Sequence, residues 1–404
     1  MNNFFEKNIS RRKFIASSIK AAGAIGLTLP LLFNKGCSKS SDELKIGYIP
    51  ITDASPLLIA HANNYFKEEG LNVKPPVLIR SWSALVEAFL ADKVNLVHFL
   101  MPIPIWMRYN NHTDVKIMAW DHTNGSAITV RGDTNISDFS DLGGKQIAVP
   151  YWYSMHNVIL QMALRKHGLT PVIKSHSERL NNNEVNLFIL SPPEMPLALA
   201  GKKIDGYIVA EPFNALGELK INAKILRFTG DIWKNHPCCV VVMKESLIKE
   251  KPVFAQKVLN GVVKAELWLA NNRERAANIL SKNGKGYLPV DEEIILRVFK
   301  GYEIDKYGEG NIPQAIKHPG WNLERIDFQP YPYPSASRFI FEQMKKTLVE
   351  GNNDFLMKYE TEFIAKDLVE TKFVKNAIEN IGGYDKFLDV NYDSPWEREE
   401  IIEI

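Results

Sequence analysis

Four short segments place polar side chains, in two of them beside aromatic ones, where an apolar run gives way to a helical pattern. Their polar residues would stand at helix N-termini, whose free N–H groups and positive dipole ends suit small oxyanions. Aromatic rings placed there would stack on planar groups. The candidate ligand-binding residues from these segments are Thr52, Asp53, Ser55, Trp82, Ser83, Trp152, Ser154, His156 and Glu194.

Two further candidates lie outside these segments. His122, in the segment His122-Thr123-Asn124-Gly125, is expected to face the same region, and Glu211 follows another apolar run. Each candidate also has an ordinary structural interpretation. The serines could cap helices, Trp82 could belong to the core, and His156 could be structural or solvent-facing. Asp53 and Glu211 could cap a helix or pin the end of a strand.

The sequence carries no catalytic motif that points to an enzyme. Neither His-Glu-x-x-His nor Gly-x-Ser-x-Gly occurs, which argues against metal hydrolases and serine hydrolases. Cys238 and Cys239 are adjacent, and neighbouring Cα atoms lie closer together than ordinary disulfides span. Two buried small thiols are therefore favoured over a strained bridge. No cofactor is expected, and a metal ion that accompanies the ligand is left open.

Apolar runs and helical patterns alternate along the body of the chain. Strands are expected at 44–51, 77–79, 94–100, 146–149, 185–190 and 204–209, with helices between them. Ala84–Val97 is similar to Pro196–Val209, which indicates two units built on one plan. The polar segment Asp133–Gly144 is expected to be the first crossover and Asn235–Pro237 the return. Amphipathic helices are expected over Pro252–Leu280 and from Asp291 onward.

The N-terminus has the order of an export signal. Arg11-Arg12 precede the apolar run Ala21–Phe33, which is shorter than the roughly 20 residues that span a bilayer. This order resembles a twin-arginine signal, read by the twin-arginine translocase. Gly36-Cys37 resembles a lipoprotein cleavage site, so Cys37 is expected to carry a lipid anchor. The protein is then extracytoplasmic, in the periplasm or on the outer face of the membrane.

Length and charge favour two α/β lobes and argue against nucleic acid. The 404 residues carry 49 Lys and Arg against 47 Asp and Glu, a net charge of +2. Residues 1–36 alone carry six basic residues and one acid, so the body is slightly negative and offers no field that tracks phosphates. The expected organisation is 1–37 signal, 38–43 linker, 44–132 plus 240–404 lobe 1 with C-terminal helices, and 133–239 lobe 2. We expect a monomer.

Several segments resemble the solute-binding component of ABC importers for nitrate, bicarbonate or sulfonates. The resemblance spans about residues 44–390. The segments that carry it are Gly47–Leu57, Pro192-Pro193-Glu194-Met195, Ile204-Asp205-Gly206, Glu211-Pro212-Phe213-Asn214, Trp233–Pro237 and Tyr331–Ser335.

This resemblance implies a fold of the type II periplasmic-binding kind, with two α/β lobes, a hinge, an interlobe cleft and a helical C-terminal extension. It implies capture of a small solute by lobe closure and delivery to an ABC permease and ATPase. It also places Trp82, Ser154 and Glu194 on segments that line the cleft.

Two departures from the family leave the solute open. Tyr151-Trp152-Tyr153 replaces a small turn, and Glu194 replaces a neutral residue. A carboxylate repels bare anions and attracts amines, amidines or a metal ion. A planar nitrogen heterocycle, such as a thiamine pyrimidine precursor, and a bicarbonate–metal pair are therefore alternatives. A pyrimidine-synthase-like enzyme and a sensor that signals to a membrane kinase are the other functions considered.

Overall fold

The computed structural model describes residues 43–387 and 395–404. Arg11, Arg12, Cys37 and the expected boundary between signal and linker lie outside the described residues. Within the described part of the chain, no helix combines the length and apolar character needed to cross a bilayer.

The first α/β unit is built on a five-stranded sheet with the order β4-β2-β5-β14-β6. Its strands are β2 (Ile46–Tyr48), β4 (Val77–Leu78), β5 (Leu96–Leu100), β6 (Val115–Trp120) and β14 (Cys239–Lys244). β2 runs parallel to β4 and β5, whereas β14 is antiparallel to β5 and β6. The carboxyl ends of β2, β5 and β6 and the amino end of β14 therefore share one edge.

The second unit is built on a six-stranded sheet with the order β10-β11-β9-β12-β8-β13. Here β8 is antiparallel to β12 and β13, and β9 is parallel to β11 and β12. The carboxyl ends of β9 and β12 therefore lie at the same edge as the amino end of β8. The strands are β8 (Ser126–Val130), β9 (Gln146–Val149), β10 (Thr170–Val172), β11 (Glu184–Ile189), β12 (Gly206–Ala210) and β13 (Lys224–Phe228).

Helices follow β2, β4, β9 and β11 as the sequence predicts, whereas the helices that begin at Pro102 and Phe213 were not predicted. Pro56 and Pro102 stand in the first turns of their helices, where a missing N–H costs nothing. The helices of the two units are α2 (Ser55–Ala62), α3 (Tyr65–Glu68), α4 (Trp82–Leu90), α5 (Pro102–Tyr109), α6 (Met155–Lys166), α7 (Met195–Ala200) and α8 (Phe213–Ile221).

The chain crosses between the sheets twice. It leaves the first sheet after β6 and enters the second at β8, so the first crossing lies at residues 121–125. The predicted first crossover at Asp133–Gly144 is wrong, because the unpredicted strand Ser126–Val130 pairs inside the six-stranded sheet. The return lies between β13 and β14, a stretch that contains the predicted Asn235–Pro237. Cys239 already pairs with Leu100 in the first sheet.

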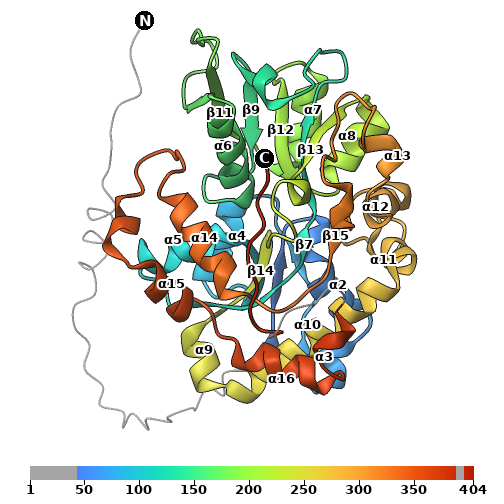
Figure 1. The fold of residues 1–404 in the computed structure, drawn as a ribbon. Coiled ribbons are helices and arrows are strands. Elements are labelled where there is room, and N and C mark those ends of the chain that lie inside the picture. The colour runs from blue at the N-terminus through green and yellow to red at the C-terminus, as the bar shows by residue number, and fades with distance from the viewer. Residues whose placement is uncertain (1–42, 388–394) are drawn as a thin grey trace, which may run out of the picture. The chain divides into compact units, whose positions relative to one another are not determined.

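The predicted amphipathic helices after residue 252 are present. α10 (Pro252–Asn271) packs against α2, α3 and α16, as Figure 1 shows in its lower half. The chain end returns beside the second crossing, where Trp233 pairs with Ile402. The other helices are α9 (Glu245–Glu250), α11 (Arg273–Leu280), α12 (Glu292–Phe299), α13 (Ile304–Tyr307), α14 (Pro334–Met344), α15 (Thr361–Asp367) and α16 (Lys372–Asn380).

Two short pairs of strands complete the described elements. β1 (Glu43–Leu44) runs parallel to β3 (Asn72–Val73). β7 (Thr123–Asn124), within the first crossing, pairs antiparallel with β15 (Ile326–Asp327). The first crossing is therefore held to the C-terminal part of the chain by backbone hydrogen bonds.

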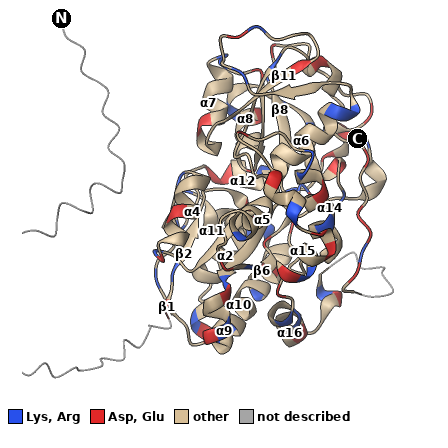
Figure 2. Ribbon diagram, turned by 90° about the vertical axis from the view of Figure 1, so that its left-hand side faces the viewer, with Lys and Arg blue, Asp and Glu red and all other residues tan. Residues whose placement is uncertain are grey.

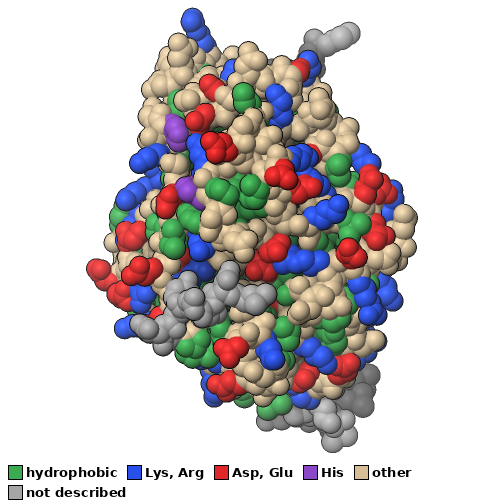
Figure 3. Space-filling view, turned by 45° about the vertical axis from the view of Figure 1, so that its right-hand side comes forward, with side chains coloured by type: hydrophobic (Ala, Val, Ile, Leu, Met, Phe, Trp, Pro, Cys, Tyr) green, Lys and Arg blue, Asp and Glu red, His purple; other side chains and the backbone are tan. Residues whose placement is uncertain are grey.

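Charges are mixed over the described surface. Lys and Arg alternate with Asp and Glu along the elements in Figure 2, and both signs are interspersed on the face in Figure 3. A surface of this kind produces no extended positive field.

Candidate functional site

Four metal-ligating side chains of the first sheet converge at its polar edge. Asp53 follows β2, His122 follows β6, and Cys238 and Cys239 stand at the start of β14. All four are fully buried, and one ligand atom from each lies within 4.8 Å of the others. They meet because the carboxyl ends of β2 and β6 and the amino end of the antiparallel strand β14 share this edge.

Hydrogen bonds join the members of this cluster. His122 Nε2 lies 2.9 Å from Asp53 Oδ2, and the Cys239 thiol donates to the same oxygen over 3.2 Å. The Cys239 backbone N–H points at His122 Nε2 over 3.3 Å. Asp53 Oδ1 has no hydrogen-bond partner among the described residues. One carboxylate oxygen is thus used twice and the other remains unpaired.

The second sheet adds a hydroxyl and an imidazole to the cluster. Ser126 opens β8, and His156 lies in the first turn of α6. His156 Nε2 is 2.9 Å from Ser126 Oγ and 3.9 Å from Cys238 Sγ, and Ser126 Oγ is 3.6 Å from that sulfur. The edges of the two sheets therefore meet at Cys238.

A second contact between the sheets lies next to the cluster. The Thr52 backbone N–H donates to the Glu211 carbonyl oxygen over 2.8 Å, and the Thr52 hydroxyl donates to the same oxygen over 3.1 Å. The Glu211 side chain faces Arg325, whose Nε donates to Oε1 over 2.7 Å. Glu211 therefore pins a strand end, as its structural interpretation expects.

Burial dominates the electrostatics of the cluster. It raises the pKa of Asp53 to about 6, although His122 acts in the opposite direction. Burial alone would lower the pKa of His122, but Asp53 and Cys238 raise it well above its ordinary value. Burial would likewise raise the pKa of Cys238, yet a hydrogen bond with Cys239 and the charge of His156 hold it low. Burial thus opposes the charge of Asp53, whereas the neighbouring groups favour charge on His122 and Cys238.

The other predicted site residues divide into buried and surface positions. Trp82 is buried edge-to-face on His98, with ring centres 5.6 Å apart, and its Nε1 has no partner among the described residues. Ser154 accepts from the Asn157 N–H and caps α6. Ser55 is buried and its hydroxyl donates to the Thr52 carbonyl oxygen.

Three predicted residues are exposed or half-buried. Ser83 is exposed, and Ser81, not Ser83, caps α4. The Trp152 indole N–H donates to Glu350. Glu194 is exposed and closes a capping box with Ser191. Contact of these residues with a solute stays a prediction.

Sequence reasoning missed Cys238, Cys239 and Ser126 as members of the site. Both cysteines are free and buried, which confirms the expectation of two unbridged thiols. Their position directly after Asn235-His236-Pro237, at the start of an apolar strand, was the available signal. Ser126 carried none, because the strand that it opens was not predicted.

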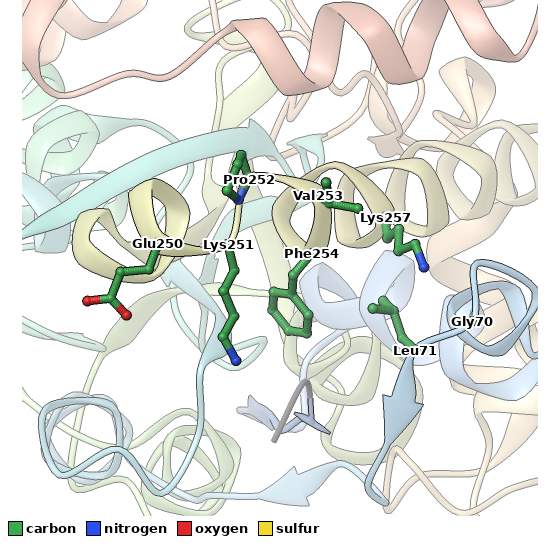
Figure 4. Close-up of a pocket in the computed structure, with 8 residues that line it drawn as sticks. All are labelled: Gly70, Leu71, Glu250, Lys251, Pro252, Val253, Phe254 and Lys257. Carbon is green, nitrogen blue, oxygen red and sulfur yellow. The ribbon is translucent and has the colours of Figure 1, made fainter. Parts of the chain in front are cut away.

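A separate cavity of about 290 Å³ lies where α9 meets α10 (Figure 4). Phe254 from α10 and Leu71 form its apolar part, and Lys257 stands at its side. None of the predicted ligand-binding residues lines it. The cavity is therefore distinct from the cluster between the sheets.

Replacing Arg325 should destabilise the protein strongly. Arg325 is 1% exposed and pairs with both Glu211 and Glu218. Arg325→Leu therefore leaves the buried Glu211 carboxylate without a cation, whereas Glu218 keeps Arg297 and Lys306. We expect a loss of about 3–5 kcal/mol in the free energy of unfolding, measured by denaturant titration. The exposed pair Arg338–Glu362 is the control, and Arg338→Leu should cost less than about 1 kcal/mol. Equal losses would contradict this account.

Glu266, on α10, should make stability fall as the pH rises. Burial, with the nearby charges of Asp121 and Asp327, raises its pKa well above the ordinary value. The folded chain then keeps a proton that the unfolded chain releases above about pH 4.3, so stability is lost towards the folded pKa. Glu266→Gln should flatten this decline in denaturant titrations at several pH values. Glu87→Gln, on the exposed face of α4, should leave it in place.

Comparisons with known proteins place the chain in a family. The model of the NMT1-like family matches residues 38–281. The nitrate/nitrite binding protein NrtA of Nostoc sp. is 27% identical over 375 residues, covering 81% of each chain. The crystal structure of the nitrate-binding protein NrtA from Synechocystis PCC 6803 aligns with a TM-score of 0.71 at 17% identity, covering 90% of this chain and 94% of that one.

A second solved structure has the same fold. The alkanesulfonate-binding protein SsuA from Xanthomonas axonopodis pv. citri aligns with a TM-score of 0.57 at 16% identity, covering 83% of this chain and 97% of that one. Both neighbours have the two-lobed α/β fold of periplasmic binding proteins, as the resemblance implied. The chain belongs to the NMT1-like family.

Proposed function

We propose that the chain is the solute-binding component of an ABC importer. It captures a small solute between its two α/β units outside the cytoplasmic membrane and delivers it to the permease and ATPase. The observation that carries the proposal is the buried polar cluster at which the edges of both sheets meet. The relatives named for nitrate and alkanesulfonate binding support the same role.

Capture would require the two units to separate. Asp53, His122, Cys238 and His156 are all buried, so a solute reaches them only when the sheet edges move apart. The two crossings, at residues 121–125 and between β13 and β14, are the covalent links about which such a motion would turn. The contacts between Thr52 and Glu211 and between Cys238 and His156 would then break and re-form.

Small oxyanions, which include nitrate, bicarbonate and sulfonates, are the first solute class of this proposal. The two fully buried arginines of the described residues, Arg227 and Arg325, are already paired with Asp231 and Glu211. An oxyanion would therefore be met by His122, His156 and the backbone N–H groups at strand and helix ends.

A planar nitrogen heterocycle is the second solute class, and unpaired atoms favour it. Asp53 Oδ1, Trp82 Nε1 and His98 Nδ1 are buried without partners among the described residues. The N–H groups of such a ring would donate to the carboxylate oxygen, and its ring nitrogens would accept from the indole N–H. The two solute classes differ in their response to the charge of Asp53.

Ligand-induced thermal shifts of the full chain test the function. At least one member of a panel of nitrate, nitrite, bicarbonate, aliphatic sulfonates and an aminopyrimidine should raise the Tm. Asp53→Asn should preserve or strengthen oxyanion binding, because it removes a repelling charge. It should weaken binding of a heterocycle that donates to this carboxylate by about 1.5–3 kcal/mol.

The same thermal-shift assay includes a control variant. Glu87→Gln changes one charge on an exposed face and should leave every shift as in the unmodified chain. A panel in which no compound changes the Tm would contradict capture of these solutes.

Export and anchoring are part of the proposal. The order of Arg11, Arg12, the apolar run and Cys37 supports twin-arginine export followed by lipidation. We expect Cys37→Ser to move the protein from the membrane fraction to the soluble extracytoplasmic fraction, measured by immunoblotting of cell fractions. Ser38→Ala, one residue away, is the control and should remain membrane-associated. An unchanged distribution of Cys37→Ser would contradict the anchor.

A further inference from the structure

We propose that Asp53, His122, Cys238 and Cys239 form a binding site for one divalent metal ion of the zinc class. The inference deepens the proposed function, because the four residues lie where the solute would be captured. The molecule bound at this cluster would be a borderline-soft cation, which the two α/β units enclose together.

The donor set fits such an ion. Two thiol sulfurs, one imidazole nitrogen and one carboxylate oxygen are the ligands that Zn²⁺ takes in four-coordinate sites. In a tetrahedral site with bonds of about 2.0–2.3 Å, ligand atoms lie about 3.3–3.8 Å apart. The four atoms here lie within 4.8 Å of one another, so small shifts would complete the sphere.

The orientation of His122 is also that of a metal ligand. Nε2 faces Asp53, while Nδ1 lies 3.4 Å from the Thr123 carbonyl oxygen. A proton on Nδ1 would donate to that oxygen and leave the Nε2 lone pair for a metal, which is the usual arrangement around metal-bound histidines. Gly125 makes room for the ring, since a Cβ at this residue would lie 2.9 Å from Nδ1.

An unpaired buried oxygen provides the second, independent observation. Asp53 is fully buried, and its Oδ1 has no partner among the described residues, although a buried carboxylate normally accepts several hydrogen bonds. Both groups that contact this carboxylate, His122 and Cys239, reach Oδ2 and leave Oδ1 without a partner. A divalent cation supplies that partner.

Groups around the cluster would support bound thiolates. Ser126 Oγ and His156 Nε2 lie 3.6 and 3.9 Å from Cys238 Sγ, within reach of weak hydrogen bonds to sulfur. Both belong to the second unit, so an ion held by Cys238 would couple the two units. Hard cations such as Ca²⁺ and Mg²⁺ prefer oxygen ligands and should not bind here.

Cobalt and zinc binding to the full chain test the proposal. Cys37→Ser is present throughout, so that Cys238 and Cys239 supply the thiols. After removal of metal by a chelator, Co²⁺ should bind at one equivalent and produce a thiolate-to-cobalt charge-transfer band, which Zn²⁺ should abolish by displacement. X-ray absorption of the Zn²⁺-loaded protein should give two sulfur and two nitrogen or oxygen neighbours, and this measurement needs no variant of the site.

Variants identify the ligands. Cys238→Ser, Cys239→Ser and His122→Gln should each weaken Zn²⁺ binding at least about tenfold in calorimetry, because each removes one ligand. His112→Gln, an exposed histidine, is the matched control and should bind as before. Circular dichroism and thermal unfolding verify that each variant is folded.

Every outcome decides between the alternatives. A missing charge-transfer band, a sulfur-free coordination sphere or equal affinity in Cys239→Ser and His112→Gln would overturn the metal site. If Zn²⁺ is held at surface groups only, Cys239→Ser and His112→Gln will bind it with equal affinity. If the metal site fails while a panel solute still raises the Tm, the proposed function stands. If both fail, the proposed function fails with it.

Discussion

The arrangement of the molecule depends on the direction of its strands. In the first sheet, β2, β5 and β6 end at the edge where the antiparallel strand β14 begins. In the second sheet, β9 and β12 end at the edge where the antiparallel strand β8 begins. Polar side chains that are distant in the sequence thus meet without any local motif. Because both polar edges face each other, the meeting point is buried, and each polar group there needs a partner or a ligand.

This burial explains the electrostatic character of the site. Arg325 pairs with Glu211 and Glu218 beside the meeting point and holds the end of β12 in place. Asp53 and His122 pair in the same way within the meeting point, but no described residue donates to Oδ1 of Asp53. The fully paired groups stabilise the position of the strand ends, whereas the incompletely paired Asp53 carboxylate can accept a further contact from a ligand.

The sequence predicted the fold well because local patterns determine it. The β-α-β order, the helix starts at Pro56 and Ser154, and the helices after Pro252 follow from periodicity and capping residues. The first crossing was misplaced because Ser126–Val130 is a short strand without a preceding helix, and its pairing partners lie about 80–100 residues later. Long-range antiparallel pairing of this kind leaves no local signal.

The site was predictable only in part. Asp53, His122 and His156 could be named because they stand beside recognisable strand or helix ends. Cys238 and Cys239 resembled ordinary buried thiols, and only the register of β14 between β5 and β6 brings them to Asp53 and His122. Glu194 and Trp152 were predicted because they stand in segments that join a strand to a helix. In the structure, however, their side chains form hydrogen bonds with Ser191 and Glu350.

The position of β14 has a mechanical consequence. The strand lies between β5 and β6, and it begins directly after the chain returns from the other sheet. Cys238 is therefore the last residue of the second crossing, about which the units would turn. It also lies next to His156 of the other unit. Rotation at this pivot would change the distance between the Cys238 sulfur and His156, so this one contact would follow the angle between the two units.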